Sequence, residues 1–226
     1  MKLQGLAPMM MSNHPIKNSL HDIESSVFYP RYLAAKKSVD DRSLNRHVWR
    51  KLLQLFQDRK TDSPSQILEL GAGIGTMFTR MIDWGLLKGS ASYTITDNDP
   101  RHLETAQDYL SLWAKKNNHS LTWSEKFHGQ LLLEDDEIHL LLDIVDIERI
   151  TSKTYLSSSY DLIIAHALLD LVDFSTVLPA LFSLLSKDGL AYLTCNFNGE
   201  THFLPGCDVD QEIIKSYHDS MEKRLK

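Results

Sequence analysis

The sequence predicts an α/β fold with a doubly wound, mostly parallel sheet and helices on both faces. From about residue 66 to residue 194, short apolar runs typical of strands alternate with helical stretches, which implies βαβ units with right-handed crossovers. A glycine-rich turn, "GAGIG", connects the first of these strands to the first of these helices. The chain has 226 residues, of which 42% are hydrophobic, enough to form a full multilayer core.

The part of the chain before the sheet reads as helical. Residues 1 to about 20 look like a loose leader, and residues 25–59 carry apolar side chains at helical spacing. We expect a second helix to begin after Asp40 and Asp41, because acidic residues favour a helix start. The segment "TDSPSQ" ends the helical part, so we divide the chain into residues 1–60 and a core of residues 61–226.

The core alternates as a parallel sheet requires. "QILELG" predicts a strand, "TMFTRMIDWGLL" a helix and "ASYTITDND" the next strand, and the long helix after it has Pro100 in its first turn, where a missing N–H costs nothing. "LLLEDDEIHLLLD" predicts a hairpin, "YDLIIAH" a strand and "VLPALFSLLSKDG" a helix closed by Gly189. "LAYLTCNFN" is the last clear strand, and one helical stretch follows it.

Composition and charge exclude several classes of function. The formal net charge is −6 and no run is rich in Lys and Arg, so we expect no nucleic-acid partner. No apolar run approaches about 20 residues and the N-terminal segment lacks the apolar core of a signal peptide, so we expect a cytoplasmic protein without a membrane partner. Cys195 and Cys207 form no C-x-x-C, and the spacing of His and Cys predicts no metal site.

The glycine run predicts a loop that holds a cofactor. Gly71, Gly73 and Gly75 stand between a strand and a helix, where they let the backbone approach a ligand closely. A dinucleotide-binding loop has the spacing G-x-G-x-x-G, and here Thr76 takes the position of the last small residue. A nicotinamide-dependent oxidoreductase is therefore disfavoured.

Four segments, taken in order, carry a family resemblance. "ELGAGIG", "TITDNDP", "LLLDIVDI" and "YDLII" resemble the motifs of class I S-adenosylmethionine (SAM) dependent methyltransferases. Each falls at the carboxyl end of a predicted strand, the edge where open α/β sheets bind ligands. The resemblance implies a Rossmann-like core in residues 61–226, a helical lid in residues 1–60, SAM as cofactor and S-adenosylhomocysteine (SAH) as product. It implies these cofactor-binding residues: Glu69, Gly71, Ala72, Gly73, Asp97, Asn98, Asp143, Ile144 and His166.

The family pattern also assigns roles to the acids. Asp97 would hydrogen-bond both ribose hydroxyls, Asn98 would flank the adenine, Asp143 would meet the adenine amino group and Ile144 would pack on the ring. Glu69 would organise the loop near the methionine amino group.

The residues alone leave a second interpretation open for several of these acids. Asp97 and Asp99 can each cap the helix that starts at Pro100. We favour the ribose for Asp97 and the cap for Asp99. Asp143 can instead be a turn residue at the strand end. Glu69 lies between two leucines in a strand, so it needs buried partners whatever its role.

His166 is the candidate for chemistry, because it ends the strand that would face the transferred methyl group. It either accepts a proton from a hydroxyl or amine nucleophile or packs beside the cofactor without proton transfer, and both readings stay open. Asp170, four residues on, either orients the imidazole or is an ordinary helix acid. Arg31 or Arg42 is the candidate partner for the methionine carboxylate.

We therefore expect a SAM-dependent methyltransferase that transfers a methyl group to an O or N nucleophile of a small-molecule acceptor. The alternative is a SAM-binding module or regulatory partner without turnover of its own. The resemblance also implies a final strand pair, and no clear one follows "LAYLTCNFN". We expect a truncated C-terminal strand or a sheet that is closed in another way, for instance by a partner.

Overall fold

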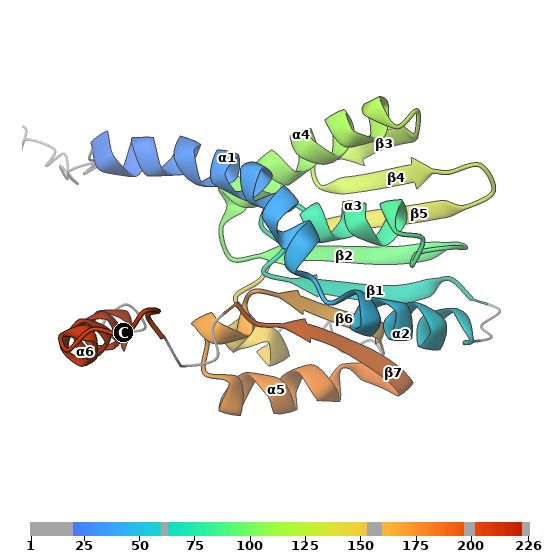
Figure 1. The fold of residues 1–226 in the computed structure, drawn as a ribbon. Helices are drawn as coiled ribbons and strands as arrows, with labels where there is room; N and C mark the ends of the chain where they lie inside the picture. The colour runs from blue at the N-terminus through green and yellow to red at the C-terminus, as the bar shows by residue number, and fades with distance from the viewer. Residues whose placement is uncertain (1–19, 60–62, 153–159, 197–201, 223–226) are drawn as a thin grey trace, which may run out of the picture.

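The computed structural model describes residues 20–59, 63–152, 160–196 and 202–222, so the predicted leader lies outside the described residues. One sheet has the strand order β3-β4-β5-β2-β1-β6-β7 (Figure 1). Its strands are β1 (Ser65–Leu70), β2 (Ala91–Asp97), β3 (Ser120–Glu125), β4 (His128–Leu132), β5 (Glu137–Ile144), β6 (Tyr160–His166) and β7 (Leu185–Thr194). The neighbours β5, β2, β1, β6 and β7 run parallel, which confirms the predicted mostly parallel sheet.

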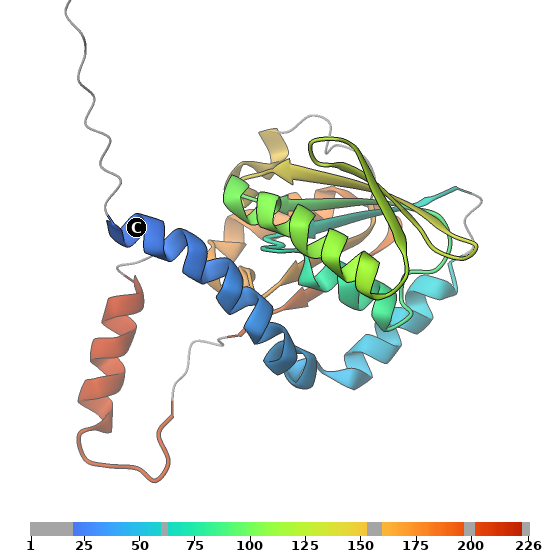
Figure 2. The ribbon, with the colours of Figure 1, turned by 90° about the horizontal axis from the view of Figure 1, so that it is seen from above.

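Helices lie on both faces of this sheet, as predicted. The described helices are α1 (Leu20–Ser43), α2 (Arg46–Gln57), α3 (Thr76–Asp83), α4 (Pro100–Lys116), α5 (Phe174–Ser183) and α6 (Asp210–Glu222), with short 3₁₀ segments at Ile147–Ser152 and Leu169–Leu171. Helices α2, α3 and α4 share one apolar cluster with the sheet, and α5 shares a second cluster on the opposite face (Figures 1 and 2).

Strand β1 shows why the two clusters form. Successive side chains of a strand point to opposite faces of the sheet. Ile67 belongs to the cluster of α2, α3 and α4, whereas Leu68 and Leu70 belong to the cluster of α5. All three are buried, so this strand carries the near-continuous apolar run of a central parallel strand covered on both faces.

The predicted hairpin is also confirmed, and it extends one edge of the sheet. Strands β4 and β5 pair antiparallel, with Leu131 opposite Ile138, and β3 pairs antiparallel with β4. Strand β5 therefore belongs to the hairpin on one side and to the parallel sheet on the other, where it pairs with β2.

Two predicted boundaries are wrong. Asp40 and Asp41 lie inside the last turn of α1, and Asn45 caps α2 instead, because its side-chain oxygen accepts the N–H groups of His47 and Val48. Gly189 does not close a helix either. The helix ends at Ser183 and Gly189 lies within β7, where an added Cβ would come within 2.7 Å of the Tyr160 carbonyl oxygen.

Helix α2 belongs to the core rather than to a separate layer. Trp49, Leu52 and Phe56 are buried in the cluster that α3 and α4 share. The Trp49 ring meets Trp84 edge-on at 4.9 Å and Tyr192 at 5.7 Å between centroids. The predicted boundary at residue 60 therefore does not separate two hydrophobic cores.

The C-terminal part differs most from the predicted family pattern. Within the described residues, no strand follows β7, and β7 forms one edge of the sheet. Helix α6 lies apart from the sheet in both views (Figures 1 and 2), and it exposes Ile213 and Tyr217. In the part of the chain that the structure describes, no helix is both long and apolar enough to cross a bilayer.

Candidate functional site

One edge of the sheet brings together the residues that the sequence singled out. Strands β5, β2, β1 and β6 are neighbours and run parallel, so their carboxyl ends share this edge. The glycine run follows β1, Asp97 ends β2, Ile144 ends β5 and His166 ends β6. Ligands bind open α/β sheets at this edge.

The loop after β1 requires glycine for both its backbone and its surroundings. Gly71 and Gly73 have φ angles of +59° and +57°, in the left-handed region that side chains disfavour. A Cβ on Gly71 would lie 2.7 Å from Leu168 Cδ1, and one on Gly73 would lie 2.9 Å from Leu33 Cδ1. Between them, Ala72 donates its N–H to the Thr96 carbonyl at 2.9 Å. The loop is thus hydrogen-bonded to β2, and Leu33 and Leu168 pack against its glycines.

Asp97 lies directly against this loop. The residue is 6% exposed, and its Oδ2 accepts the Gly73 N–H at 2.8 Å. Oδ1 accepts the Asp99 N–H at 3.0 Å and lies 3.0 Å from Nδ1 of His102. Asp99 itself caps α4, as predicted, because its side chain accepts the Arg101 N–H. The carboxylate therefore links the glycine loop to the start of α4.

His102 was not predicted as a site residue. The hydrogen bond that His102 donates to the Asp97 carboxylate raises the pKa of His102, with burial acting against it. Its position one turn into the helix after "TDNDP" is the only sequence signal, since a histidine there can reach back to an acid at the strand end. The ribose candidate Asp97 thus shares its carboxylate with a titratable neighbour.

Glu69 has the buried partner that its position requires. The residue is 2% exposed, and the Tyr93 hydroxyl donates to its Oε2 at 2.7 Å. Burial raises the pKa of Glu69 to about 7, although the Tyr93 hydrogen bond and the Arg80 charge oppose the rise. The residue shares a face of β1 with Ile67, so its side chain lies on the side of the sheet that α2, α3 and α4 cover. Its role toward the loop stays a prediction.

The adenine candidates lie beside Asp97 at the same edge. In the register of β2 and β5, Asp97 is opposite Ile144 and Thr96 is opposite Asp143. Ile144 is 45% exposed and Asn98 is exposed, so an apolar and a polar side chain both face outward here. Their roles toward a flat ring stay predictions.

His166 lies at the end of β6 between two other segments. Its Nδ1 is 2.6 Å from Thr194 Oγ1 on β7, and its Nε2 is 3.6 Å from Asp40 Oδ2 on α1. Burial lowers the pKa of His166, and the Arg80 charge adds to this effect. Asp170, the predicted orienting acid, lies in a 3₁₀ segment, and among the described residues its Oδ1 is buried without a hydrogen-bond partner. The role of Asp170 in orienting His166 stays a prediction, and no contact between the two side chains is described.

Arg80 is the buried cation that the sequence reasoning missed. Its side chain is fully buried in α3, with Nε 2.6 Å from Asp41 Oδ1 and Nη2 3.7 Å from Asp40 Oδ2. The predicted cations Arg31 and Arg42 are exposed on α1 instead. A possible signal was the helical spacing from Met77 to Arg80, which places an arginine near the apolar side of a helix. Through Asp41 and the Lys37 carbonyl, Arg80 binds the C-terminal part of α1.

A hollow of about 310 Å³ lies next to His166. Its walls come from the end of α1, the start of α2, and the carboxyl ends of β6 and β7. The side chains that give it polar character are Asp40, Ser43, Asn45, His166, Thr194 and Asn196. It lies at the strand edge of the glycine loop, beside β6, the neighbour of β1.

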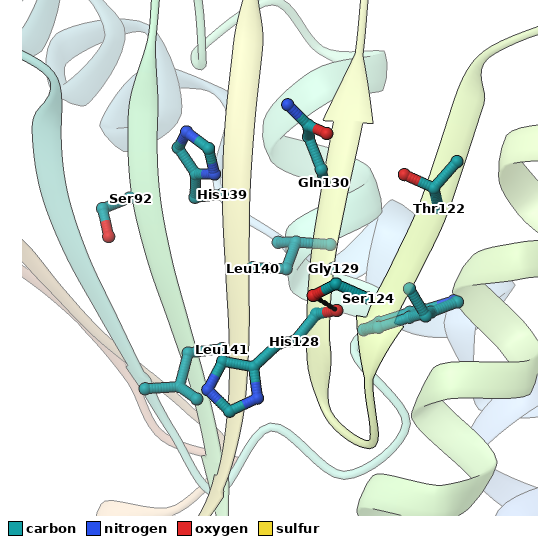
Figure 3. A pocket seen from close by; sticks show the side chains of 10 residues that line it. Ser92, Thr122, Ser124, His128, Gly129, Gln130, His139, Leu140 and Leu141 are labelled. Carbon is teal, nitrogen blue, oxygen red and sulfur yellow. Dashed lines mark hydrogen bonds between the residues drawn. The ribbon is translucent and has the colours of Figure 1, made fainter.

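A larger hollow of about 520 Å³ lies elsewhere on the sheet (Figure 3). Ser92, His139, Gln130 and Thr122 form a row across β2, β5, β4 and β3 there. Ser92 is the second residue of β2, whereas Asp97 is the last. This hollow therefore lies toward the amino end of β2, away from the glycine loop.

Comparison with known proteins gives structural matches only. No protein-family model matches the chain, and no curated protein matches it in sequence. It is similar to a SAM-dependent methyltransferase from Clostridium acetobutylicum (12% identity, 74% of this chain and 57% of that chain, TM-score 0.43). It is also similar to the CurJ carbon methyltransferase (20% identity, 61% and 31% of the two chains, TM-score 0.42). A third match is the plantazolicin methyltransferase BpumL with SAH (16% identity, 75% and 55%, TM-score 0.38).

Each of these matches spans less than two thirds of the solved chain. The three solved proteins are methyltransferases by name, and each TM-score lies below 0.5. The Rossmann-like α/β sheet follows from the strand order of this chain itself.

Proposed function

We propose that the chain is a SAM-dependent methyltransferase that transfers a methyl group to an O or N nucleophile of a small-molecule acceptor. One observation carries the proposal: the Gly73 N–H donates to the buried Asp97 carboxylate, so the glycine loop and the acid of the next strand form one structure at the sheet edge. We propose that the lid within residues 1–60 is α1, because α2 packs in the core of the sheet, and that the chain is a cytoplasmic enzyme without nucleic-acid or membrane partners.

The residues at this edge fit SAM. Gly71 and Gly73 carry no Cβ, and an added Cβ would collide with Leu168 or Leu33. Once these two leucines move aside, a ligand can therefore approach the loop backbone closely. Asp97 offers carboxylate oxygens, which suit the two hydroxyls of a ribose. SAM has no pyrophosphate and needs none of the phosphate-binding spacing that Thr76 interrupts. We assign the ribose to Asp97 and the adenine to Asn98, Asp143 and Ile144.

The acceptor would occupy the hollow of about 310 Å³ beside His166. SAM supplies a methyl group on a positive sulfur: the acceptor lone pair forms the new bond to carbon, and the sulfur keeps the electron pair of the broken bond. His166 would take the proton that the hydroxyl or amine loses, and solvent would then receive it. Burial lowers the pKa of His166 and so favours the neutral imidazole, the state in which it can accept a proton.

A specific observation supports the alternative, a SAM-binding module without turnover. Helix α1 covers both the loop, through Leu33, and the His166 ring, through Asp40. Turnover then requires α1 to move away from the site and back in every cycle. A binding module needs only the state in which α1 covers the site. Acceptor turnover separates the two possibilities.

Titration calorimetry of the full chain with SAH, and with NAD as the comparison, tests the cofactor. We expect saturable binding of SAH alone. Binding of NAD in place of SAH, or of neither compound, would refute the proposal. SAM consumption with a panel of small hydroxyl and amine compounds then tests turnover, and SAH binding without any turnover would favour the binding module.

A further inference from the structure

His166 is held between segments that are far apart in the sequence. Thr194 of β7 meets Nδ1 at 2.6 Å, so that nitrogen has a partner. Nε2 faces Asp40 Oδ2 across 3.6 Å, which is too long for a direct hydrogen bond. Among the described residues, Nε2 is buried without a hydrogen-bond partner. In this ring, Nδ1 therefore has a hydrogen-bond partner, whereas Nε2 faces the Asp40 carboxylate without a direct hydrogen bond.

The charges around this ring come from two helices. Arg80 of α3 and Lys36 of α1 oppose a positive imidazole, and Asp40 of α1 favours one. Asp40 is also shared, because its Oδ1 lies 3.1 Å from Lys36 Nζ and its Oδ2 lies 3.7 Å from Arg80 Nη2. The β7 residues beside His166, Tyr192 and Thr194, are uncharged at neutral pH. Asp40 is thus the negative group that offsets two cations at His166.

Asp40 reaches His166 because α1 is anchored over the site. The neighbouring Asp41 is 2.6 Å from the buried Arg80, and Leu33, two turns earlier on α1, lies against Gly73. The helix that covers the glycine loop therefore also brings a carboxylate to the imidazole. When α1 lies elsewhere, His166 keeps Thr194 but loses the acid.

We propose that Asp40 is the positioning residue of His166. The imidazole then has a carboxylate to stabilise its protonated form only while α1 lies over the site. The inference rests on the proposed function for the role of His166. The proton of the acceptor O–H or N–H passes to Nε2, and its electron pair stays on the oxygen or nitrogen. The positive charge on the ring is then opposed by the Asp40 carboxylate. Asp40 takes the orienting role that we predicted for Asp170.

NMR titration of the His166 ring in the full chain, without any ligand, tests this proposal. The chain has ten histidines, so the His166 signal is assigned from its loss in His166→Gln. Asp40→Asn is expected to lower the titration midpoint by about one unit or more, because an opposite charge close by is removed. Asp108→Asn, which removes an exposed acid of α4, is the matched control and should leave the midpoint unchanged.

Lys36→Gln provides a second, opposite test. It removes a cation near His166 and releases the Asp40 oxygen that Lys36 binds, so the midpoint should rise. Asp40→Glu keeps the charge, and its midpoint should lie nearer to that of the wild type than to that of Asp40→Asn.

An unchanged midpoint in Asp40→Asn would overturn the proposal. If that variant does not fold, an unchanged or lower midpoint in Lys36→Gln would overturn it instead. Since no cofactor is present in the titration, a failure to bind SAH counts against the proposed function alone. SAH binding together with an unmoved midpoint counts against the role of Asp40 alone.

Discussion

Replacing Glu69 with Gln should remove a pH dependence from the stability of the protein. Glu69 is buried beside Tyr93, and burial raises its pKa from 4.5 to about 7. Between these two values, the folded state binds the proton more tightly than the unfolded state does. The free energy of unfolding must therefore fall as the pH rises from about 4.5 to about 7, and it levels off above that.

The size of the effect follows from the shift. A rise from 4.5 to about 7 corresponds to about 3 kcal/mol at about 1.4 kcal/mol per unit. Most of this loss of unfolding free energy, about 2 to 3 kcal/mol, occurs between pH 5 and pH 8. Gln keeps an oxygen that can accept the Tyr93 hydroxyl, but its amide N–H groups need partners, a cost of about 1 to 3 kcal/mol at every pH. The change of stability with pH is therefore the informative quantity.

Urea unfolding followed by tryptophan fluorescence at pH 5, 6, 7 and 8 measures this change. The difference in unfolding free energy between Glu69→Gln and wild type should move in favour of the variant as the pH rises. Glu104→Gln is the control, because Glu104 is exposed on α4 and its side chain meets only Lys126 among the contacts described. Parallel pH profiles for Glu69→Gln and wild type would refute the reasoning that Glu69 is held protonated by burial.

Three further predictions concern the loop and its acid. Asp97→Ala should weaken SAH binding on the order of ten- to a hundredfold, as expected for lost hydrogen bonds to a charged group, and calorimetry that shows unchanged affinity would remove Asp97 from the site. Gly73→Ala should destabilise the fold by more than Gly89→Ala in thermal melts, because both have positive φ but only Gly73 has a neighbour, Leu33, within 4 Å; equal losses would refute the contact. His102→Gln should remove a stabilisation that is full below pH 6.5 and is lost as the pH rises through the raised pKa of His102. Urea unfolding from pH 5.5 to 8.5 tests this, and coinciding stability profiles of His102→Gln and wild type would contradict it.

The position of Asp97 beside the glycine loop was predictable because its signals are local. A strand, a glycine run and a helix follow one another in the chain, and parallel strands place their carboxyl ends together. Asp97 therefore had to lie near Gly73 once both were assigned to neighbouring strand ends, and the structure gives a hydrogen bond of 2.8 Å between them. The cap formed by Asp99 was readable for the same reason.

The misread boundaries come from local patterns that tertiary contacts override. Asp40 and Asp41 carry the sequence signature of a helix start, yet the pair with the buried Arg80 keeps them in the last turn of α1. Gly189 carries the signature of a helix end, yet β7 has already begun at Leu185, which pairs with Tyr160. In both cases the deciding partner is far away in the sequence.

The acceptor site that we propose depends on contacts that the sequence does not mark. The side chains around His166 come from α1, from α3 and from β7, and no periodicity in the sequence connects these segments. The glycine loop is the part from which a cofactor class can be predicted, whereas the hollow beside His166 is lined by the end of α1, the start of α2 and the residues after β7. Substitutions at Ser43, Asn45 and Asn196 should therefore change which acceptor is used without changing SAH affinity, because these residues line the hollow and are not among the contacts of the glycine loop.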